Sequence, residues 1–258
     1  MLDTSRYHEL TLLDRTDFSD DLAVFHLRAR EPVDFTPGQY ATLGLVEDDL
    51  DRPLLRPYSV ASAPHSTELE FFIERVDGGD LTTRLWKLQQ GDTVWMRKRV
   101  VGRFVLDEGV RDHLMVATVT GVGPYVSIFR AQKQALERGA LTTPHRMLVL
   151  HGASRSWELG TYHDELRRAD EEHDWLRYVP TVSRPWEDPD WPGELGRAED
   201  VLRKHLDQVG FTPATTAAYT CGHPQMIDKA QGILERAGIP EERIHEEKYF
   251  REPAAAPR

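Results

Sequence analysis

Residues 113–124 decide the fold and read His113-Leu114-Met115-Val116-Ala117-Thr118-Val119-Thr120-Gly121-Val122-Gly123-Pro124. The run begins with apolar residues typical of a buried strand, and helical spacing follows over residues 126–138. Glycines in a strand-to-helix turn let the backbone approach a pyrophosphate, whose charge the helix N-terminus favours. Glycine-rich turns of this kind are also common without a ligand, so a purely structural role stays open.

The alternation of strands and helices continues toward the end of the chain. Apolar strands are expected at residues 146–150, 178–182 and 217–221, and helices at 162–172, 198–209 and 224–237. Strands separated by helices are typical of a doubly wound parallel sheet, in which ligands bind beyond the carboxyl ends of the strands.

Before this region the pattern is one of short strands. Apolar or alternating runs lie at residues 22–27, 40–45, 69–74 and 93–96, and one helix is expected at 81–88. Turn residues such as Thr36-Pro37-Gly38 separate the runs. The sequence therefore predicts two domains: an antiparallel β-barrel over residues 1–107, then an α/β domain with a doubly wound parallel sheet over residues 108–258.

Composition and charge narrow the classes of function. The chain has 258 residues, of which 40% are hydrophobic and 29% charged, the balance of a globular protein. Its net charge of -11 argues against nucleic-acid binding, and no apolar run reaches the roughly 18 residues that span a bilayer. Cys221 is the single cysteine, so no internal disulfide or iron–sulfur cluster is expected. The N-terminus has no secretory pattern, and we expect a cytoplasmic monomer without a resident metal or membrane insertion.

Unusual residues follow two more strands of the predicted sheet. Cys221-Gly222-His223-Pro224-Gln225-Met226 follows the last strand, where a small residue, a glycine and a helix-starting proline make a tight platform for a flat ring. Cys221 taken alone is more typical of a buried small side chain. Ser183-Arg184 and Gly196-Arg197 lie at neighbouring strand-end loops, and arginine forks suit a phosphate monoester. Either arginine alone is more typical of a surface residue.

Two features of the barrel half could also carry function. The segment Arg56-Pro57-Tyr58-Ser59-Val60-Ala61-Ser62 joins a fixed cation, a flat aromatic ring and a hydroxyl, which could bind a flavin. An ordinary strand with a cross-strand tyrosine pair is the alternative. The basic cluster, defined as Arg97, Lys98, Arg99 and Arg103, could meet an acidic partner or form a solvated surface turn.

Together these motifs resemble the ferredoxin–NADP reductase superfamily, in that family's order and over nearly the whole chain. The family has a flavin barrel with an Arg-x-Tyr-Ser motif, then a nucleotide domain with a Gly-Pro turn, a Ser-Arg pair and a Cys-Gly-x-Pro-x-Met motif. Three segments resemble its bacterial branch: Gly102-Arg103-Phe104-Val105-Leu106-Asp107, Gly123-Pro124-Tyr125-Val126-Ser127-Ile128 and Glu247-Lys248-Tyr249-Phe250. The resemblance implies FAD in the first domain and NADP(H) in the second.

The resemblance also implies roles for the FAD positions. Arg56 would hold the pyrophosphate, Tyr58 would stack on the isoalloxazine ring, and Ser59 would lie near its N5 atom. Tyr249 would cover the other ring face and Phe250 the adenine. The full set of matching positions is Arg56, Pro57, Tyr58, Ser59, Phe72, Ile73, Glu74, Leu81, Thr82, Thr118, Tyr249 and Phe250.

For NADP(H), the resemblance implies that the turn from Thr120 to Pro124 takes the pyrophosphate. Arg184 and Arg197 would read the 2′-phosphate, which is why NADP(H) is expected rather than NAD(H). The matching positions are Thr120, Gly121, Gly123, Pro124, Arg155, Ser183, Arg184, Arg197, Cys221, Gly222 and Met226. The residues expected at the reacting rings are Ser59, Cys221, Glu247 and Tyr249.

The sequence departs from the family pattern at four places. Val119 stands where the family's Gly-Thr-Gly opening has its first glycine. Arg155 lies about one residue from its expected position, and the segment 185–192 is longer and richer in tryptophan than the family's. Eight residues follow Phe250, and they could shield the nicotinamide site or extend freely.

The expected activity is electron transfer between NADPH and ferredoxin or flavodoxin, by hydride transfer at flavin N5 followed by release of single electrons. Both carriers are small and acidic, so both suit the basic cluster. An NAD(P)H:flavin or quinone reductase without a protein partner is the nearest alternative. A non-enzymatic flavin-binding redox sensor or electron-transfer subunit is an alternative of another class. A multi-component oxygenase reductase would normally need an iron–sulfur domain with four cysteines.

Overall fold

The computed structural model describes residues 4–46 and 53–249. The chain divides into two compact units. The first, here called the barrel unit, runs up to Val105 and also includes Gly123–Ala135; the second, the sheet unit, contains Leu106–Val122 and the chain from Leu136. The helical segment Gly123–Ala135 thus groups with the barrel, although the sequence pattern assigned it to the second domain.

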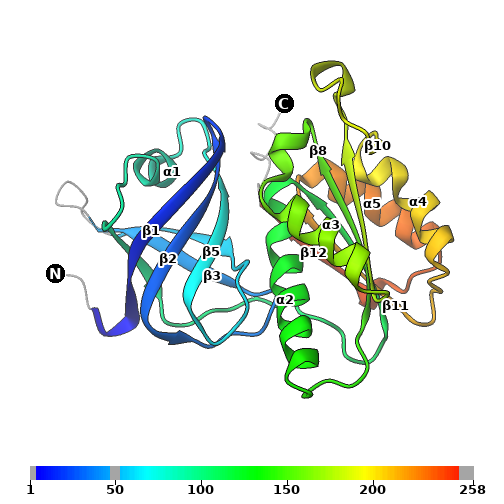
Figure 1. The fold of residues 1–258 in the computed structure, drawn as a ribbon, viewed down its shortest axis with the longest axis horizontal. Helices are drawn as coiled ribbons and strands as arrows, with labels where there is room; N and C mark the ends of the chain where they lie inside the picture. Colours follow the sequence, from blue (N-terminus) through cyan, green and yellow to red (C-terminus); the bar gives the residue numbers. More distant parts are fainter. Residues whose placement is uncertain (1–3, 47–52, 250–258) are drawn as a thin grey trace, which may run out of the picture. The chain divides into compact units, whose positions relative to one another are not determined.

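The barrel unit is a curled antiparallel sheet of six strands in the order β4-β3-β6-β1-β2-β5 (Figure 1). Its strands are β1 (Tyr7–Ser19), β2 (Leu22–Val33), β3 (Tyr40–Leu45), β4 (Leu54–Ser59), β5 (Ser66–Glu74) and β6 (Thr93–Arg97), with helix α1 (Asp80–Leu85) after β5. The Ala61 amide donates to Glu70 O at 2.9 Å, joining the segment after β4 to β5. The two edges of the sheet therefore meet, as in a barrel.

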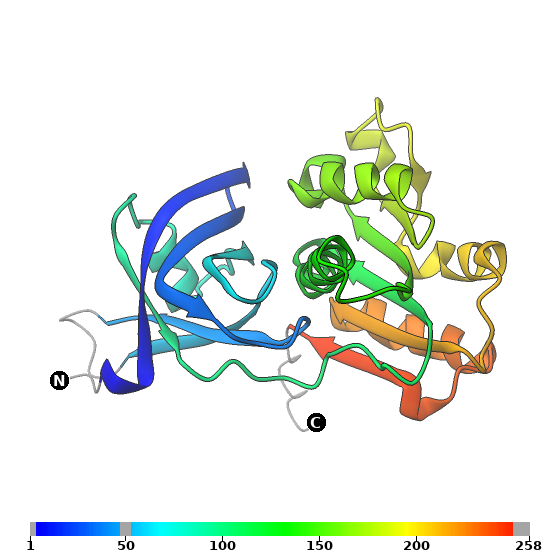
Figure 2. The same cartoon turned by 60° about the horizontal axis from the view of Figure 1, so that its bottom comes forward.

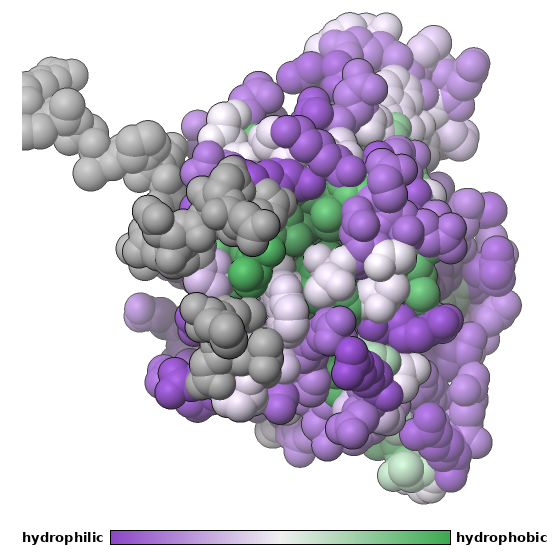
Figure 3. Space-filling model, turned by 90° about the vertical axis from the view of Figure 1, so that its left-hand side faces the viewer, coloured by the Kyte–Doolittle hydropathy of each residue, from purple (hydrophilic) through white to green (hydrophobic). Residues whose placement is uncertain are grey.

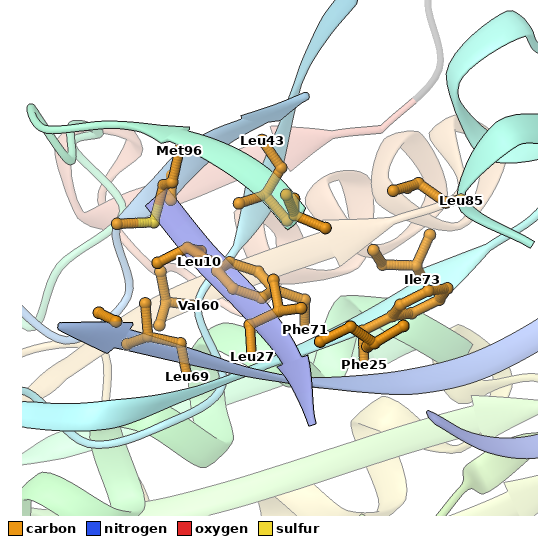
Figure 4. Close-up of a cluster of buried hydrophobic side chains, with 14 of the residues drawn as sticks. Leu10, Phe25, Leu27, Leu43, Val60, Leu69, Phe71, Ile73, Leu85 and Met96 are labelled. Atoms are coloured by element: carbon orange, nitrogen blue, oxygen red, sulfur yellow. The ribbon is translucent and has the colours of Figure 1, made fainter. Parts of the chain in front are cut away.

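The core of the barrel unit is formed by alternate residues of the strands. Leu10, Phe25, Leu27, Phe71 and Ile73 are at most 1% exposed, and Figure 4 shows them gathered with side chains from neighbouring strands. Because successive side chains point to opposite faces of a strand, this alternation leaves polar residues outside. Hydrophilic side chains cover most of the molecular face drawn in Figure 3.

Helix α2 (Gly123–Glu137) is bonded to the barrel unit through its first turns. Ser127 Oγ donates to Ser62 O at 2.7 Å, and both groups are buried. Arg130 Nη1 lies 2.9 Å from Glu70 Oε2 and 3.3 Å from Ala61 O. These polar contacts explain why the start of α2 clusters with the barrel.

The sheet unit contains a six-stranded parallel sheet in the order β10-β9-β8-β7-β11-β12 (Figure 2). The strands are β7 (Asp112–Thr118), β8 (Arg146–Ala153), β9 (Leu176–Val182), β10 (Glu194–Leu195), β11 (Thr216–Gly222) and β12 (Ile244–Lys248). Its helices are α3 (Tyr162–Glu172), α4 (Ala198–Val209) and α5 (Pro224–Arg236). The predicted combination of an antiparallel barrel and a doubly wound parallel sheet is confirmed.

The two faces of the parallel sheet are covered by different helices. Leu114 and Leu148 pack with Leu202 of α4 and Ile227 of α5 on one face. On the other face the His163 ring of α3 lies 5.9 Å from that of Tyr178. β7 lies at the centre, with β8 on one side and β11 on the other. This reversal of strand order is where open α/β sheets bind ligands.

Candidate functional site

The turns after β7 and β11 approach each other so closely that each requires a glycine. A Cβ on Gly121 would lie 2.3 Å from Cys221 O, and a Cβ on Gly222 would lie 2.2 Å from Thr118 Oγ1. Gly222 also has a φ of +124°. Thr118 Oγ1 accepts the His223 amide at 2.8 Å, which ties the two turns together. The structure thus places both predicted motifs at the reversal point of the sheet.

Val119 has a left-handed backbone, with a φ of +43°, at the position where a glycine was expected. Such a conformation is a true outlier for a β-branched residue. His151 Nε2 lies 2.8 Å from Val119 O, and His151 Nδ1 lies 3.1 Å from the Tyr178 hydroxyl. Burial lowers the pKa of His151 to about 3. The imidazole is therefore neutral, and Nε2–H donates to the carbonyl.

Sequence reasoning missed His151 and Tyr178 as supports of this turn. His151 follows the apolar run 146–150, and a polar residue at the end of a buried strand was the only available signal. Both side chains are buried, at 0% and 4% exposure.

Cys221, Glu247 and Tyr249 lie together at the carboxyl end of β11 and β12. Cys221 is fully buried and is paired in register with Glu247. Burial raises the pKa of the Cys221 thiol well above its usual value; the Glu247 charge adds to this, and a hydrogen bond with Tyr249 opposes it. The thiol is therefore neutral, which excludes a thiolate nucleophile at neutral pH.

Tyr249 lies across the turn after β7. Its amide donates to Gly222 O at 3.3 Å and its hydroxyl to Thr120 O at 3.4 Å. Tyr249 therefore contacts both strand-end turns. Phe250, the neighbouring predicted FAD residue, lies outside the described residues, as do residues 251–258.

Three arginines follow neighbouring strands at one edge of the sheet. Arg155, Arg184 and Arg197 come just after β8, β9 and β10, which run parallel. The Arg184 amide donates to Ser154 O at 3.0 Å, which fixes the first two loops side by side. Arg184 and Arg197 are exposed and Arg155 is partly exposed. The structure thus brings the predicted 2′-phosphate residues to one edge.

Arg155 is held by carboxylates. Its Nη1 donates to Glu158 Oε1 at 2.8 Å, while Glu158 Oε2 accepts the amides of Ser154 and Arg155 at 2.8 and 3.2 Å. The hydrogen bond with Glu158, followed by that with Glu187, raises the pKa of Arg155. Ser183 Oγ donates to Ala153 O at 3.2 Å.

The other residues that were predicted to bind NADP(H) mostly pack against other parts of the protein. Met226 is 3% exposed and belongs to the hydrophobic core between sheet and helices. Pro124 and Gly123 are buried at the start of α2. A Cβ on Gly123 would lie 3.9 Å from the Ser59 Cβ, so within the barrel unit the start of α2 lies next to the predicted flavin motif.

Arg56, Tyr58 and Ser59 lie on β4, an edge strand of the barrel sheet. Arg56 is exposed and donates to Leu55 O at 2.8 Å, and its guanidinium has no carboxylate partner in the part of the chain that the structure describes. Burial raises the pKa of Tyr58, with Arg56 acting in the opposite direction. Ser59 is 8% exposed. A cation, a neutral phenol and a hydroxyl on one edge strand fit FAD, because the cation can meet phosphate while the ring stacks.

The remaining predicted FAD positions divide between the surface and the core. Ile73 and Leu81 point into the barrel core, so only their backbone groups could meet a flavin. Phe72 is 6% exposed, and its ring packs edge-on against Phe18 at 5.8 Å. Thr82 Oγ1 accepts the Val76 amide at 3.2 Å. Pro57 and Glu74 are exposed.

The basic cluster is exposed at the end of β6. The Lys98 amide donates to Arg6 O at 3.0 Å, which places a further exposed cation, missed from the sequence, beside the cluster. Over residues 4–46 and 53–249, no carboxylate lies within ion-pair distance of Arg97, Lys98, Arg99 or Arg103.

Neither a metal site nor a membrane span is found in the described ranges. No group of three or more His, Cys, Asp or Glu side chains there could hold a metal ion. None of the helices in those ranges combines the length and apolar character that crossing a membrane requires.

Two family models match the chain. An oxidoreductase FAD-binding domain matches residues 9–104, and an oxidoreductase NAD-binding domain matches residues 115–232. The two together cover the barrel strands and most of the parallel sheet.

The chain is similar to ferredoxin–NADP reductases along most of its length. It is 30% identical to the enzyme named ferredoxin–NADP reductase from Azotobacter vinelandii over 238 residues, 86% of each chain. It is 31% identical to the flavodoxin/ferredoxin–NADP reductase of Escherichia coli K12 over 219 residues, 81% of this chain and 83% of that one.

The chain is also similar in fold to a solved structure that contains both cofactors. The ferredoxin NADP+ reductase of Neisseria gonorrhoeae, with bound FAD and NADP, matches with a TM-score of 0.80 and 26% identity, covering 95% of this chain and 99% of that one. The sequence and the fold of this chain both match those of ferredoxin–NADP reductases over most of its length. The chain belongs to the ferredoxin–NADP reductase family of FAD- and NADP-dependent oxidoreductases.

Proposed function

We propose that this protein is a ferredoxin–NADP reductase that exchanges electrons between NADP(H) and a small acidic carrier, ferredoxin or flavodoxin. The observation that carries the protein-partner part is the exposed basic cluster. Its four cations lack carboxylate partners among the described residues, on a chain whose net charge is -11. Complementary charge steers association with an acidic partner. A reductase of free flavins or quinones would not need such a surface.

In this proposal residues 1–107 bind FAD and residues 108–258 bind NADP(H). Bound FAD supplies the conversion between two-electron hydride chemistry and single-electron transfer. Arg56 would neutralise the pyrophosphate of FAD, Tyr58 would stack on its ring, and Ser59 would offer a hydroxyl to that ring. Arg56 is exposed and Tyr58 is partly exposed, so these two side chains are accessible to a ligand.

On the nucleotide side, the turn at Thr120 and Gly121 takes the pyrophosphate, and Arg184 and Arg197 bind the 2′-phosphate. The close contact of Gly121 with Cys221 keeps both turns rigid, which favours a fixed orientation of the nicotinamide. Cys221 offers a small neutral surface beside the ring, and Glu247 places a charge next to it. Tyr249 covers this position and moves aside when the nicotinamide enters.

Charge reversal tests the carrier assignment. A variant with Arg97→Glu, Lys98→Glu and Arg99→Glu is compared with a control that carries Lys87→Glu, Arg168→Glu and Arg236→Glu. All six residues are exposed and both variants change the net charge equally. We expect the first to raise the KM for ferredoxin or flavodoxin by at least about tenfold while ferricyanide reduction by NADPH is retained. The control should keep both activities.

Two outcomes contradict the proposal. If both variants reduce the carrier equally well, the basic cluster is not its docking surface. If the unmodified protein reduces free flavin or quinone but neither carrier, the protein is a small-molecule reductase.

A further inference from the structure

The two arginines Arg155 and Arg184 already share an anion, the carboxylate of Glu187. Arg155 Nε donates to Glu187 Oε2 at 2.6 Å, and Arg155 Nη2 forms an ion pair with the same oxygen. Arg184 Nη1 lies 3.6 Å from Glu187 Oε1. A carboxylate therefore lies between the guanidinium groups of Arg155 and Arg184.

Glu187 comes from the short 3-10 turn Pro185–Glu187, in the segment 185–192 that contains Trp186 and Trp191. The Glu187 amide donates to Arg184 O, which fixes this turn directly after the arginine. The glutamate is thus positioned by the local backbone structure of this loop.

The two glutamates on Arg155 differ in what else they hold. Glu158 accepts two backbone amides, those of Ser154 and Arg155, so its removal would leave two partly buried donors without this partner. The side-chain contacts of Glu187, in contrast, are ion pairs and hydrogen bonds with arginines. Glu187 is also the more exposed of the two, at 34% against 17%. Glu187 is therefore the carboxylate that a ligand can displace.

A phosphate monoester uses the same guanidinium donors as a carboxylate. A 2′-phosphate that binds Arg184 and Arg155 must either displace Glu187 or lie beside its negative charge. Both cost affinity, and neither affects a nucleotide that lacks the 2′-phosphate. Such a repulsive element changes specificity without adding any contact to the preferred ligand.

We propose that Glu187 is a specificity-determining residue that competes with the 2′-phosphate for Arg155 and Arg184. Its carboxylate weakens the binding of NADP(H) but not of NAD(H), and so makes the preference for NADP(H) smaller. The inference rests on the proposed function, in which these strand-end arginines bind the nucleotide. It adds that the preference for NADP(H) over NAD(H) depends on the Glu187 carboxylate as well as on the arginines.

The test measures binding with the FAD-loaded protein and needs no turnover. Isothermal titration calorimetry follows adenosine 2′,5′-bisphosphate, which carries the 2′-phosphate, and 5′-AMP, which lacks it. The variants are Glu187→Gln, which keeps the side-chain shape without the charge, and Asp190→Asn, which removes an exposed charge of the same loop. Arg184→Ala reports on the arginine site itself.

We expect Glu187→Gln to bind the bisphosphate roughly tenfold more tightly than the unmodified protein, as removal of one like charge beside a phosphate does. Asp190→Asn should leave that affinity unchanged, and 5′-AMP should bind all three proteins alike. Added salt should reduce the difference, because these charges are partly exposed.

Equal or weaker bisphosphate binding by Glu187→Gln overturns the inference, since Glu187 would then be neutral or would position Arg155 for the ligand. An equal gain with Asp190→Asn also overturns it, because the effect would come from net loop charge. If Arg184→Ala leaves bisphosphate affinity unchanged, the nucleotide assignment in the proposed function fails instead.

Discussion

His151 Nε2 donates to the carbonyl oxygen of Val119 at 2.8 Å, and Val119 holds a left-handed backbone. A side chain with a Cβ loses about 1–2 kcal/mol in this conformation relative to the right-handed one. His151 and the Tyr178 hydroxyl, 3.1 Å from its other nitrogen, hold the turn in this conformation. The valine is thus held in a backbone conformation that glycine adopts more readily.

Val119→Gly is expected to relieve the strain of the turn. Glycine adopts a positive φ freely, which offsets its greater freedom in the unfolded chain. We expect the free energy of unfolding of Val119→Gly to be about 1 kcal/mol higher than that of Val119→Ala, because alanine keeps the Cβ. Urea unfolding followed by circular dichroism measures both. If Val119→Gly were no more stable than Val119→Ala, the left-handed backbone at this position would carry no cost for a residue with a Cβ.

His151→Leu removes the hydrogen bond to the strained turn and leaves buried polar groups without a partner. The expected loss of stability is about 1–3 kcal/mol. The loss should be smaller when it is made in the Val119→Gly background, because that turn no longer needs to be held. Equal losses in the two backgrounds, in a double-mutant cycle, would show that the histidine and the valine act independently.

Two buried histidines make the sheet unit sensitive to acid. Burial lowers the pKa of His151 to about 3, and burial with the neighbouring His145 lowers the pKa of His113 to about 4. An unfolded histidine has a pKa near 6.5, so between these values the unfolded chain binds protons that the folded unit does not. Stability from these groups is complete above about pH 6.5 and is lost progressively as the pH falls toward 4 and then 3.

Each of these histidines is expected to lower the free energy of unfolding by roughly 1.4 kcal/mol in total between about pH 7.5 and about pH 5.5. Unfolding free energies between about pH 7.5 and about pH 5.5 measure it, a range above most carboxylate titration. His151→Leu should make this loss smaller. A stability that stays flat across this range would contradict the neutral, buried state of both rings.

Tyr249→Ser is expected to tighten NADP binding. Tyr249 lies across both turns through its bonds to Gly222 O and Thr120 O, and the nicotinamide has to displace it. Removal of a ring that must be displaced at a cost of about 1.4 kcal/mol raises affinity about tenfold. A spectral titration of the FAD-loaded protein with NADP+ measures the change. An unchanged dissociation constant would count against this gate, and 5′-AMP, which has no nicotinamide, serves as the control ligand.

Local patterns were sufficient for the fold. The apolar run 113–117, the helical spacing after it and the repeated alternation predicted the parallel sheet, because burial on both faces imposes continuous apolar strands. Motifs at strand ends predicted which residues meet at the reversal point of the sheet. The boundary of the barrel unit was harder to predict from the sequence, because the Ser127–Ser62 hydrogen bond that joins α2 to the barrel strands connects residues far apart in the chain.

The contacts that hold Val119 and Glu187 in place could not be predicted either, because they also join residues far apart in the sequence. Nothing local to Val119 indicates that a histidine from the next strand binds its carbonyl. Likewise the loop 185–192 could be recognised as unusual, but the position of Glu187 between Arg155 and Arg184 depends on how three strand-end loops fold together. Arg6 joins the basic cluster only because β1 pairs with β6.

The state of Cys221 has a practical consequence for anyone who labels this protein. The only thiol of the chain is fully buried and protonated, and both properties keep it from reacting with maleimides or peroxide. A cysteine introduced at Asp190 would therefore be the single reactive site without any change to the native residue. A fluorophore attached there would follow the loop that carries Glu187 while nucleotides bind, against a background free of native labelling.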